Sequence, residues 1–133
     1  RLALTRADSV EIDFALEDAD SDPAARFRVV MEESQVVGYL MYERLDIEGL
    51  PDEVSIYRFM IDRAHQGKGY GRAALDALIA EIRTLPGIRR VSICYMPDNS
   101  GARELYRKFG FVEMGTDADG EILASFTLPD IGA

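Results

Sequence analysis

The chain has 133 residues, 47% of them hydrophobic, and carries a formal net charge of −9 at pH 7. This length suits one domain with a proper core. The acidic balance argues against nucleic acid as a partner, because affinity for nucleic acid comes mostly from Lys and Arg. No apolar run is long enough to span a bilayer, and no basic-then-apolar signal segment opens the chain. We therefore expect a single domain over residues 1–133, away from membranes. The single cysteine, Cys94, cannot form an internal disulfide, so the expected compartment is the cytoplasm.

Hydrophobic periodicity predicts the element order β-α-β-β-β-α-β-α-β-β, which is an α/β (α+β) pattern. The expected strands lie near Leu2–Thr5, Phe27–Glu32, Val36–Leu45, Val54–Ile61, Arg90–Cys94, Phe111–Thr116 and Ile122–Leu128. One short helix is expected from Ser9 to Leu16, followed by an acidic loop. Ser34-Gln35 and residues 117–120 are typical of turns between antiparallel strands, and residues 48–52 separate the third strand from the fourth.

A glycine-rich segment, Gln66-Gly67-Lys68-Gly69-Tyr70-Gly71, lies between the fourth strand and the next helix. An apolar stripe predicts that helix: Leu75, Leu78, Ile79 and Ile82. Alternate glycines allow backbone N–H groups to converge, and a helix N-terminus behind them favours an anion such as phosphate. The spacing excludes a Walker loop, which needs Gly-x-x-x-x-Gly-Lys-Ser/Thr, and a dinucleotide fingerprint, which needs Gly-x-Gly-x-x-Gly.

A second helical segment runs from Asn99 to Gly110. Asn99 is a good N-cap, and Gly110 stands where a helix C-terminus favours a residue that tolerates positive φ. Between them, one helical face is apolar: Ala102, Leu105, Tyr106 and Phe109. A short strand precedes this helix and ends at Met96-Pro97-Asp98.

Together the two segments resemble the two signatures of the GNAT superfamily of N-acetyltransferases, over roughly residues 27–128. Gln66, Gly69 and Gly71 meet the pattern Gln/Arg-x-x-Gly-x-Gly/Ala. The second segment meets Asn-x-x-Ala-x-x-x-Tyr-x-x-x-Gly-Phe at every defined position. The resemblance implies the GNAT fold, a mixed central sheet of about six to seven strands with flanking helices. It also implies acetyl-CoA as co-substrate, without a metal.

The same resemblance implies roles for individual residues. It assigns protonation of the departing thiolate to Tyr106, and stabilisation of the developing oxyanion to the backbone N–H of Met60, give or take one position. It implies that acetyl-CoA lies against the following residues: Phe59, Ile61, Gln66, Gly67, Lys68, Gly69, Tyr70, Gly71, Arg72, Asn99 and Ala102. Glu43 and Glu53 are the available carboxylates for a general base, and proton loss through ordered water is an alternative.

The stretch from Tyr57 to Asp62, with the glycine segment behind it, resembles the bacterial spermine/spermidine acetyltransferases. This implies a small cationic amine as acceptor, and an acidic surface would attract one. An equally good explanation of the acidic surface is solubility. A protein or peptide amine as acceptor, and a noncatalytic acyl-CoA-binding module, remain alternatives. The fold is also compatible with a homodimer.

Relatives usually place two helices between the first two strands, whereas this chain has room for one. Either the acceptor site is more open, or part of the natural chain is absent from the sequence. Of the remaining reactive residues, His65 has no metal-ligand partners and is expected in a loop. Cys94, the single cysteine, alternates with apolar neighbours and is expected to be a buried structural thiol rather than a nucleophile.

Overall fold

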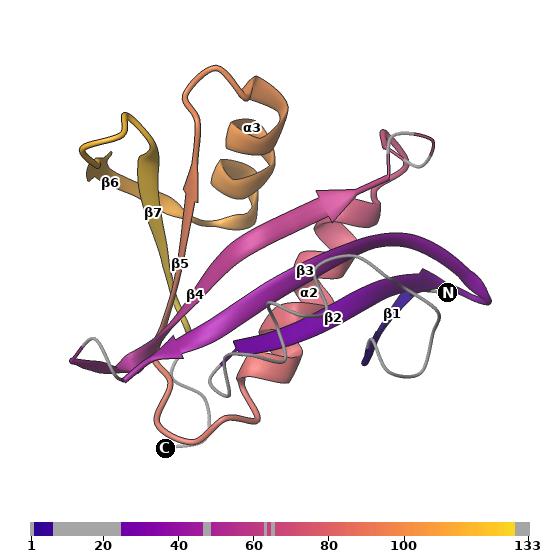
Figure 1. The fold of residues 1–133 in the computed structure, drawn as a ribbon, viewed down its shortest axis with the longest axis horizontal. Helices are drawn as coiled ribbons and strands as arrows, with labels where there is room; N and C mark the ends of the chain where they lie inside the picture. The colour runs from indigo at the N-terminus through magenta and orange to yellow at the C-terminus, as the bar shows by residue number, and fades with distance from the viewer. Residues whose placement is uncertain (1, 7–24, 47–48, 63, 65, 130–133) are drawn as a thin grey trace.

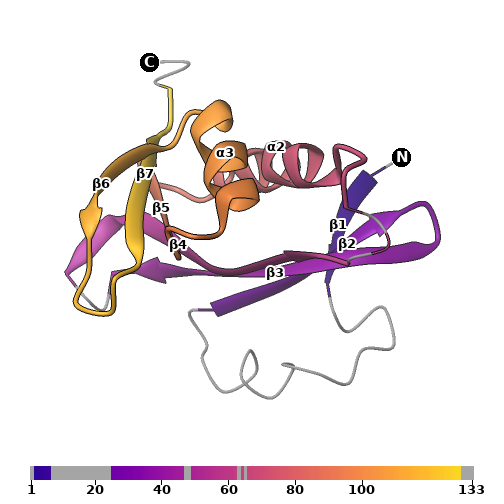
Figure 2. The same cartoon turned by 90° about the horizontal axis from the view of Figure 1, so that it is seen from above.

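The computed structural model describes residues 2–6, 25–46, 49–62, 64 and 66–129. In these residues seven strands form one sheet in the order β1-β2-β3-β4-β5-β7-β6. Figure 2 shows helices α2 and α3 on the same face of this sheet. The elements are β1 Leu2–Arg6, β2 Ala25–Glu32, β3 Gln35–Leu45, β4 Leu50–Ile61, α2 Tyr70–Ile82, β5 Arg90–Tyr95, α3 Ser100–Phe109, β6 Val112–Thr116 and β7 Ile122–Thr127. The predicted α/β class with a mixed sheet and flanking helices is confirmed.

The sheet is mixed because β4 and β5 run parallel, whereas every other described pair of neighbouring strands is antiparallel. In this parallel pairing Glu53 lies opposite Arg90 at one end and Ile56 lies opposite Ile93 at the other, and the pairing stops there. Beyond that point β4 continues to Ile61 while β5 turns away, and Figure 1 shows the two strands diverging. The sheet is therefore split at its centre, at the carboxyl ends of both strands.

A bulge in β4 decides which of its side chains face the helices. Met41 of β3 lies opposite Arg58, but the next residue of β3 lies opposite Ile56, so Tyr57 is the extra residue. An extra residue reverses the alternation of a strand. Ile56 before the bulge belongs to the helix-side core, and Phe59 after it packs against that core.

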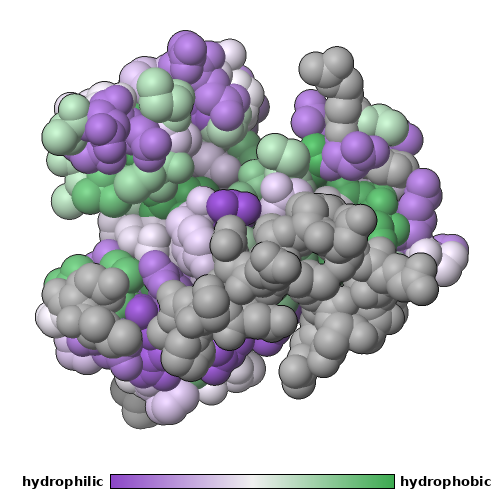
Figure 3. Space-filling model, in the orientation of Figure 1, coloured by the Kyte–Doolittle hydropathy of each residue, from purple (hydrophilic) through white to green (hydrophobic). Residues whose placement is uncertain are grey.

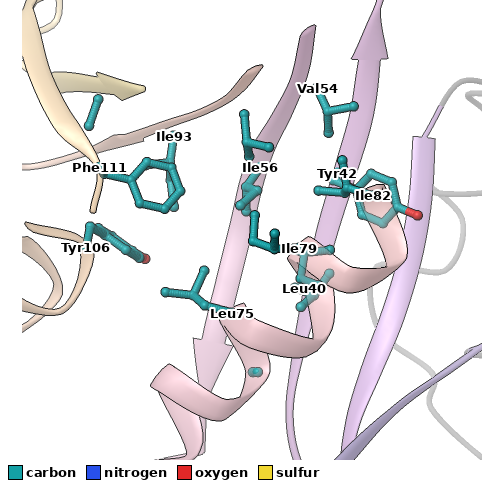
Figure 4. Close-up of a cluster of buried hydrophobic side chains, with 14 of the residues drawn as sticks. Leu40, Tyr42, Val54, Ile56, Leu75, Ile79, Ile82, Ile93, Tyr106 and Phe111 are labelled. Carbon is teal, nitrogen blue, oxygen red and sulfur yellow. The ribbon is translucent and has the colours of Figure 1, made fainter. Parts of the chain in front are cut away.

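The core lies between the sheet and the two helices, as Figure 4 shows. The predicted stripe of α2 is buried against it: Leu75, Leu78, Ile79 and Ile82. A polar cluster binds the same helix to the sheet, because Glu81 of α2 accepts a hydrogen bond from the Tyr42 hydroxyl and pairs with Arg28 at 3.1 Å. The position of α2 is thus fixed by both apolar and charged contacts.

Besides strand ends that shift by one or two residues, three predictions about local structure differ from the observed chain. Strand β4 begins at Leu50, because the irregular register between β3 and β4 there accommodates Pro51, which has no N–H to donate. The first hairpin turn falls on Glu33 and Ser34, one residue earlier than expected. Cys94 is exposed rather than buried, because its neighbours in β5, Ile93 and Tyr95, are the residues that face the core.

The expected helix from Ser9 to Leu16 and the acidic segment before β2 lie outside the described residues, as does His65. Among the residues that the structure describes, no helix is both long and apolar enough to cross a membrane.

Candidate functional site

A cavity of about 570 Å³ lies where β4 and β5 part, between the end of β4, the loop after it, and α3. Figure 3 shows the surface hollowed between the part that carries α3 and the part that carries the end of β4. The lining residues are Phe59, Met60, Ile61, Gln66, Gly67, Gly69, Tyr70, Gly71, Arg72, Asn99, Gly101, Ala102, Leu105 and Tyr106. The structure therefore brings nearly all the predicted site residues together.

The lining of the cavity differs from the predicted site at three residues. Lys68 is exposed and does not line the cavity. Gly101 and Leu105 line it although neither was predicted to bind the cofactor. Leu105 stands three residues after Ala102 on α3, so the helical period places both on one face. That spacing was the available signal for Leu105.

The glycine loop ends in an uncapped helix N-terminus. Gly67 and Gly69 have φ values of 79° and 82°, a conformation that other residues adopt at a cost. Gly69 is the N-cap of α2, makes no side-chain capping bond, and no acidic residue occupies the first turn. The first intrahelical bond of this end runs from the Ala73 N–H to the Gly69 carbonyl, at 3.1 Å. Such an end attracts a phosphate group, because its first N–H groups and the helix dipole both favour an anion.

Gly71 has a different purpose from the two glycines before it. It lies inside α2, and a Cβ at this position would stand 3.0 Å from the Leu105 Cδ2 atom of α3. Its missing side chain therefore permits the close approach of the two helices that border the cavity.

The backbone N–H and carbonyl groups of β4 point alternately toward β3 and toward the cavity. A hydrogen bond at the end of the strand shows which residues point which way. The Asp62 N–H donates to the Val37 carbonyl of β3 at 2.7 Å. Two residues earlier, the Met60 carbonyl also points at β3, since a Cβ on Gly38 would lie 2.3 Å from it. Because successive peptide groups of a strand point to opposite sides, the Met60 N–H faces β3 as well.

Phe59 and Ile61 consequently turn their N–H and carbonyl groups away from β3, toward the split in the sheet. The Gln66 side-chain amide confirms this direction, because it donates to the Ile61 carbonyl at 2.9 Å. This bond also attaches the glycine loop to the end of β4. The geometry thus places the cavity-facing N–H groups on the residues either side of Met60, within the predicted margin of one position.

Tyr106 of α3 is 5% exposed and lines the cavity. Three rings surround it, those of Tyr95, Phe111 and Phe59, with centroids at 5.2, 5.8 and 6.4 Å. In Figure 4 its hydroxyl points away from α3, in the direction of α2. Burial raises the pKa of this hydroxyl to about 12, so the group is a protonated phenol at neutral pH.

The start of α3 is set by Asn99, whose side-chain oxygen accepts a hydrogen bond from the Ala102 N–H at 3.3 Å. This confirms the predicted N-cap. The predicted helix end is also confirmed, because Gly110 has a φ of 124° and its N–H bonds back to Tyr106. The two caps fix the length of the helix that carries Tyr106.

The two carboxylates considered as a general base lie elsewhere. Glu53 forms an ion pair with Arg90 at 3.5 Å, where β4 and β5 are still paired, and neither Glu53 nor Glu43 lines the cavity. Cys94 is also absent from the lining. Desolvation raises the pKa of its thiol, and the nearby Glu121 and Asp117 carboxylates raise it further, which disfavours a nucleophilic thiolate.

Comparison with known proteins agrees with this geometry. The chain is 36% identical over 93 residues to the spermine/spermidine N(1)-acetyltransferase of Bacillus subtilis strain 168, covering 67% of this chain and 61% of that protein. It is 28% identical over 102 residues to the L-2,4-diaminobutyric acid acetyltransferase of Streptomyces anulatus, covering 72% of this chain and 54% of that protein. The chain thus matches about three fifths or less of the length of these curated relatives.

The fold also matches solved structures. A GNAT family acetyltransferase from Elizabethkingia anophelis, crystallised with acetyl-CoA bound, superposes with a TM-score of 0.74 at 15% identity, over 96% of this chain and 98% of that one. The sequence profile of the acetyltransferase (GNAT) family matches residues 3–111, which include the glycine loop, Tyr106 and the split between β4 and β5. The chain therefore belongs to the acetyltransferase (GNAT) family.

Proposed function

We propose that this chain transfers the acetyl group of acetyl-CoA to a primary amine, with a polyamine such as spermidine or spermine as the acceptor. The observation that carries the proposal is the position of Tyr106. Its buried, protonated hydroxyl lies at a cavity that is also lined by the end of β4, where that strand pairs with β3 but no longer with β5. A pure binding site has no need for a weak acid at this position.

The residues present fit acetyl-CoA. The uncapped N-terminus of α2 and the positive-φ glycines before it suit a pyrophosphate. The Phe59 carbonyl and the Ile61 N–H, which face the cavity, would pair with the amides of the pantetheine arm, as one more strand would pair with β4. When bound, acetyl-CoA supplies a thioester as the acyl donor.

Two groups of this chain would then act on the reacting atoms. We assign the oxyanion donor to the Phe59 N–H, because the Met60 N–H faces β3 and Phe59 is in ring contact with Tyr106, at 6.4 Å between centroids. A donor at this position stabilises the negative charge that develops on the thioester oxygen. The Tyr106 hydroxyl gives its proton to the sulfur as the carbon–sulfur bond breaks, while the amine nitrogen forms the new bond to carbon.

Several observations support a polyamine acceptor. The relative with 36% identity is named for spermine and spermidine, and the relative with 28% identity is named for a diamino acid. Both substrates carry a second amino group beside the one that is acetylated. The net charge of −9 favours the encounter with such a cation.

An acceptor panel tests the proposal. Thiol release from acetyl-CoA is measured with spermine, spermidine, diaminobutyrate and a lysine peptide, and the acetylated product is identified by mass spectrometry. We expect the highest kcat/KM for a polyamine, and we expect it to fall with added salt because the attraction is electrostatic. Turnover restricted to the peptide would reject the polyamine and support a protein acetyltransferase instead.

A further inference from the structure

A polar network stands beside Tyr106 without lining the cavity. Glu113 of β6 accepts two hydrogen bonds from the Arg103 guanidinium of α3, at 2.7 and 2.9 Å. The Tyr95 hydroxyl, at the end of β5, donates to the same carboxylate at 2.8 Å. One carboxylate thus joins α3, β5 and β6.

Glu113 occupies a place in the sheet where an apolar side chain would be expected. Its partner across the β6–β7 ladder is Ala124, which is fully buried, and Ala124 pairs in turn with Ile93 of the core. The Glu113 side chain is half-buried and keeps part of its hydration, with 28% of its surface exposed. Charged and well-directed hydrogen bonds fix its position in this row. Arg103, followed by Tyr95, provides these bonds and holds the pKa of Glu113 below its usual value.

Both branches of the network lead to Tyr106. Arg103 stands three residues before Tyr106 on α3, so the two side chains leave the same side of the helix. The Tyr95 ring lies 5.2 Å from the Tyr106 ring, at an interplanar angle of 44°. The contacts therefore form a closed loop, from Tyr106 along α3 to Arg103, through Glu113 to Tyr95, and back to Tyr106.

We propose that Glu113 is a positioning residue for the proton donor: it holds Arg103 and Tyr95 so that the Tyr106 hydroxyl stays directed into the cavity. This inference rests on the proposed function, since a positioned hydroxyl matters only if Tyr106 gives up its proton. Glu113 itself transfers no proton and touches neither acetyl-CoA nor the amine.

A double-mutant cycle with Tyr106→Phe tests the inference. Glu113→Ala is expected to lower kcat about tenfold, because a displaced donor is less effective than a positioned one. The KM for acetyl-CoA should change by less than about twofold, since the glycine loop and β4 are untouched. In the Tyr106→Phe background the same substitution should have no further effect, because there is no hydroxyl left to position.

Three further variants make the cycle specific. Tyr95→Phe removes only the hydroxyl that Glu113 binds and is expected to lower kcat in the same direction. Glu113→Gln keeps one oxygen acceptor but loses the charge and the second acceptor, so its kcat should lie between those of wild type and Glu113→Ala. The matched control is Glu104→Gln on the same helix. It breaks an exposed ion pair, in which the Lys108 Nζ lies 2.9 Å from the Glu104 Oε1, and it should leave kcat unchanged.

The outcomes separate this inference from the proposed function. Equal losses of kcat with and without the Tyr106 hydroxyl, or an unchanged kcat in Glu113→Ala, would overturn the positioning role while the acetyltransferase assignment stands. A wild-type protein that binds acetyl-CoA without turning over any amine would overturn both. If Glu113→Ala does not fold, Tyr95→Phe in the same two backgrounds decides the question.

Discussion

At the scale of single residues, burial changes the acidity of the Tyr106 hydroxyl. Its pKa, raised to about 12, keeps the hydroxyl protonated far above neutral pH. An amine acceptor, by contrast, must lose a proton before it can attack, and its pKa lies near 10.4 in the lysine reference. The rate should therefore be limited by deprotonation of the amine and not by ionisation of Tyr106.

The first prediction concerns this pH dependence. We expect kcat/KM to rise with pH and to show no descending limb below about pH 10 that depends on Tyr106. The measurement is the pH profile of kcat/KM at saturating acetyl-CoA, with Tyr106→Phe as the control. A fall between about pH 8 and pH 9 in the wild type that is absent from the mutant would contradict the raised pKa.

The sequence could predict most site residues, because each signature is local. The spacing of Gln66, Gly69 and Gly71 specifies a turn before a helix, whichever strand lies beside it. The oxyanion donor could be placed only to within one residue. Which N–H faces the cavity depends on the bulge at Tyr57, and that bulge is defined by pairing with β3.

At the scale of elements, the site depends on the close contact between β3 and the end of β4. Gly38 of β3 leaves the room that the Met60 carbonyl occupies, since an added Cβ would lie 2.3 Å from that oxygen. A backbone oxygen cannot move aside as a flexible side chain does. The strand end that faces the cavity would have to shift.

The second prediction is the effect of Gly38→Ala. We expect a loss of about 1–3 kcal/mol in unfolding free energy, as for other overpacked positions, and a raised KM for acetyl-CoA. Chemical denaturation and steady-state kinetics measure the two effects. Gly101→Ala is the control for stability, because a Cβ there meets nothing within 4 Å, and the exchange in α3 should raise stability by up to about 1 kcal/mol. Equal stability of the two variants would contradict the close contact.

Elements were predictable where the apolar period is strong. The stripe from Leu75 to Ile82 and the face around Tyr106 specified α2 and α3, because each contains complete helical turns. The beginning of β4 was predicted too late, because a proline such as Pro51 normally separates strands. Here the strand includes Pro51 because the register between β3 and β4 shifts between Arg44 and Leu45.

For the whole molecule, several phenols become harder to ionise on folding. Burial raises the pKa of Tyr106 and Tyr95 to about 12, and hydrogen bonding to Glu113 adds to the effect on Tyr95. Burial, with the hydrogen bond to Glu81, also raises the pKa of Tyr42. In the unfolded chain these phenols ionise near pH 10.

The third prediction follows from the sign of these shifts. Above about pH 10 the unfolded state releases protons that the folded state still binds, so unfolding free energy should fall as pH rises from about 10 to 12. Below about pH 10 both the folded and the unfolded state hold these protons, so the phenols do not make the unfolding free energy depend on pH. Denaturation at a series of pH values measures the fall, and Tyr106→Phe should make it shallower. A slope unchanged by that substitution would contradict the shift assigned to Tyr106.

The overall topology was accessible only through the resemblance. Local patterns gave the strands, but they could not show that β7 lies between β5 and β6, or that β4 pairs with β5 in parallel for four residue pairs. The split that makes the cavity arises from those long-range pairings. No single segment of the chain contains it.

The measurement that tests the central claim most directly is thiol release from acetyl-CoA with spermidine, by wild type and Tyr106→Phe at equal acetyl-CoA occupancy. Loss of a general acid typically costs about 10²-fold or more, so kcat should fall by about that factor while the affinity for acetyl-CoA is retained. Equal rates in the two proteins, with acetyl-CoA bound in both, would contradict the assignment of Tyr106 as the proton donor.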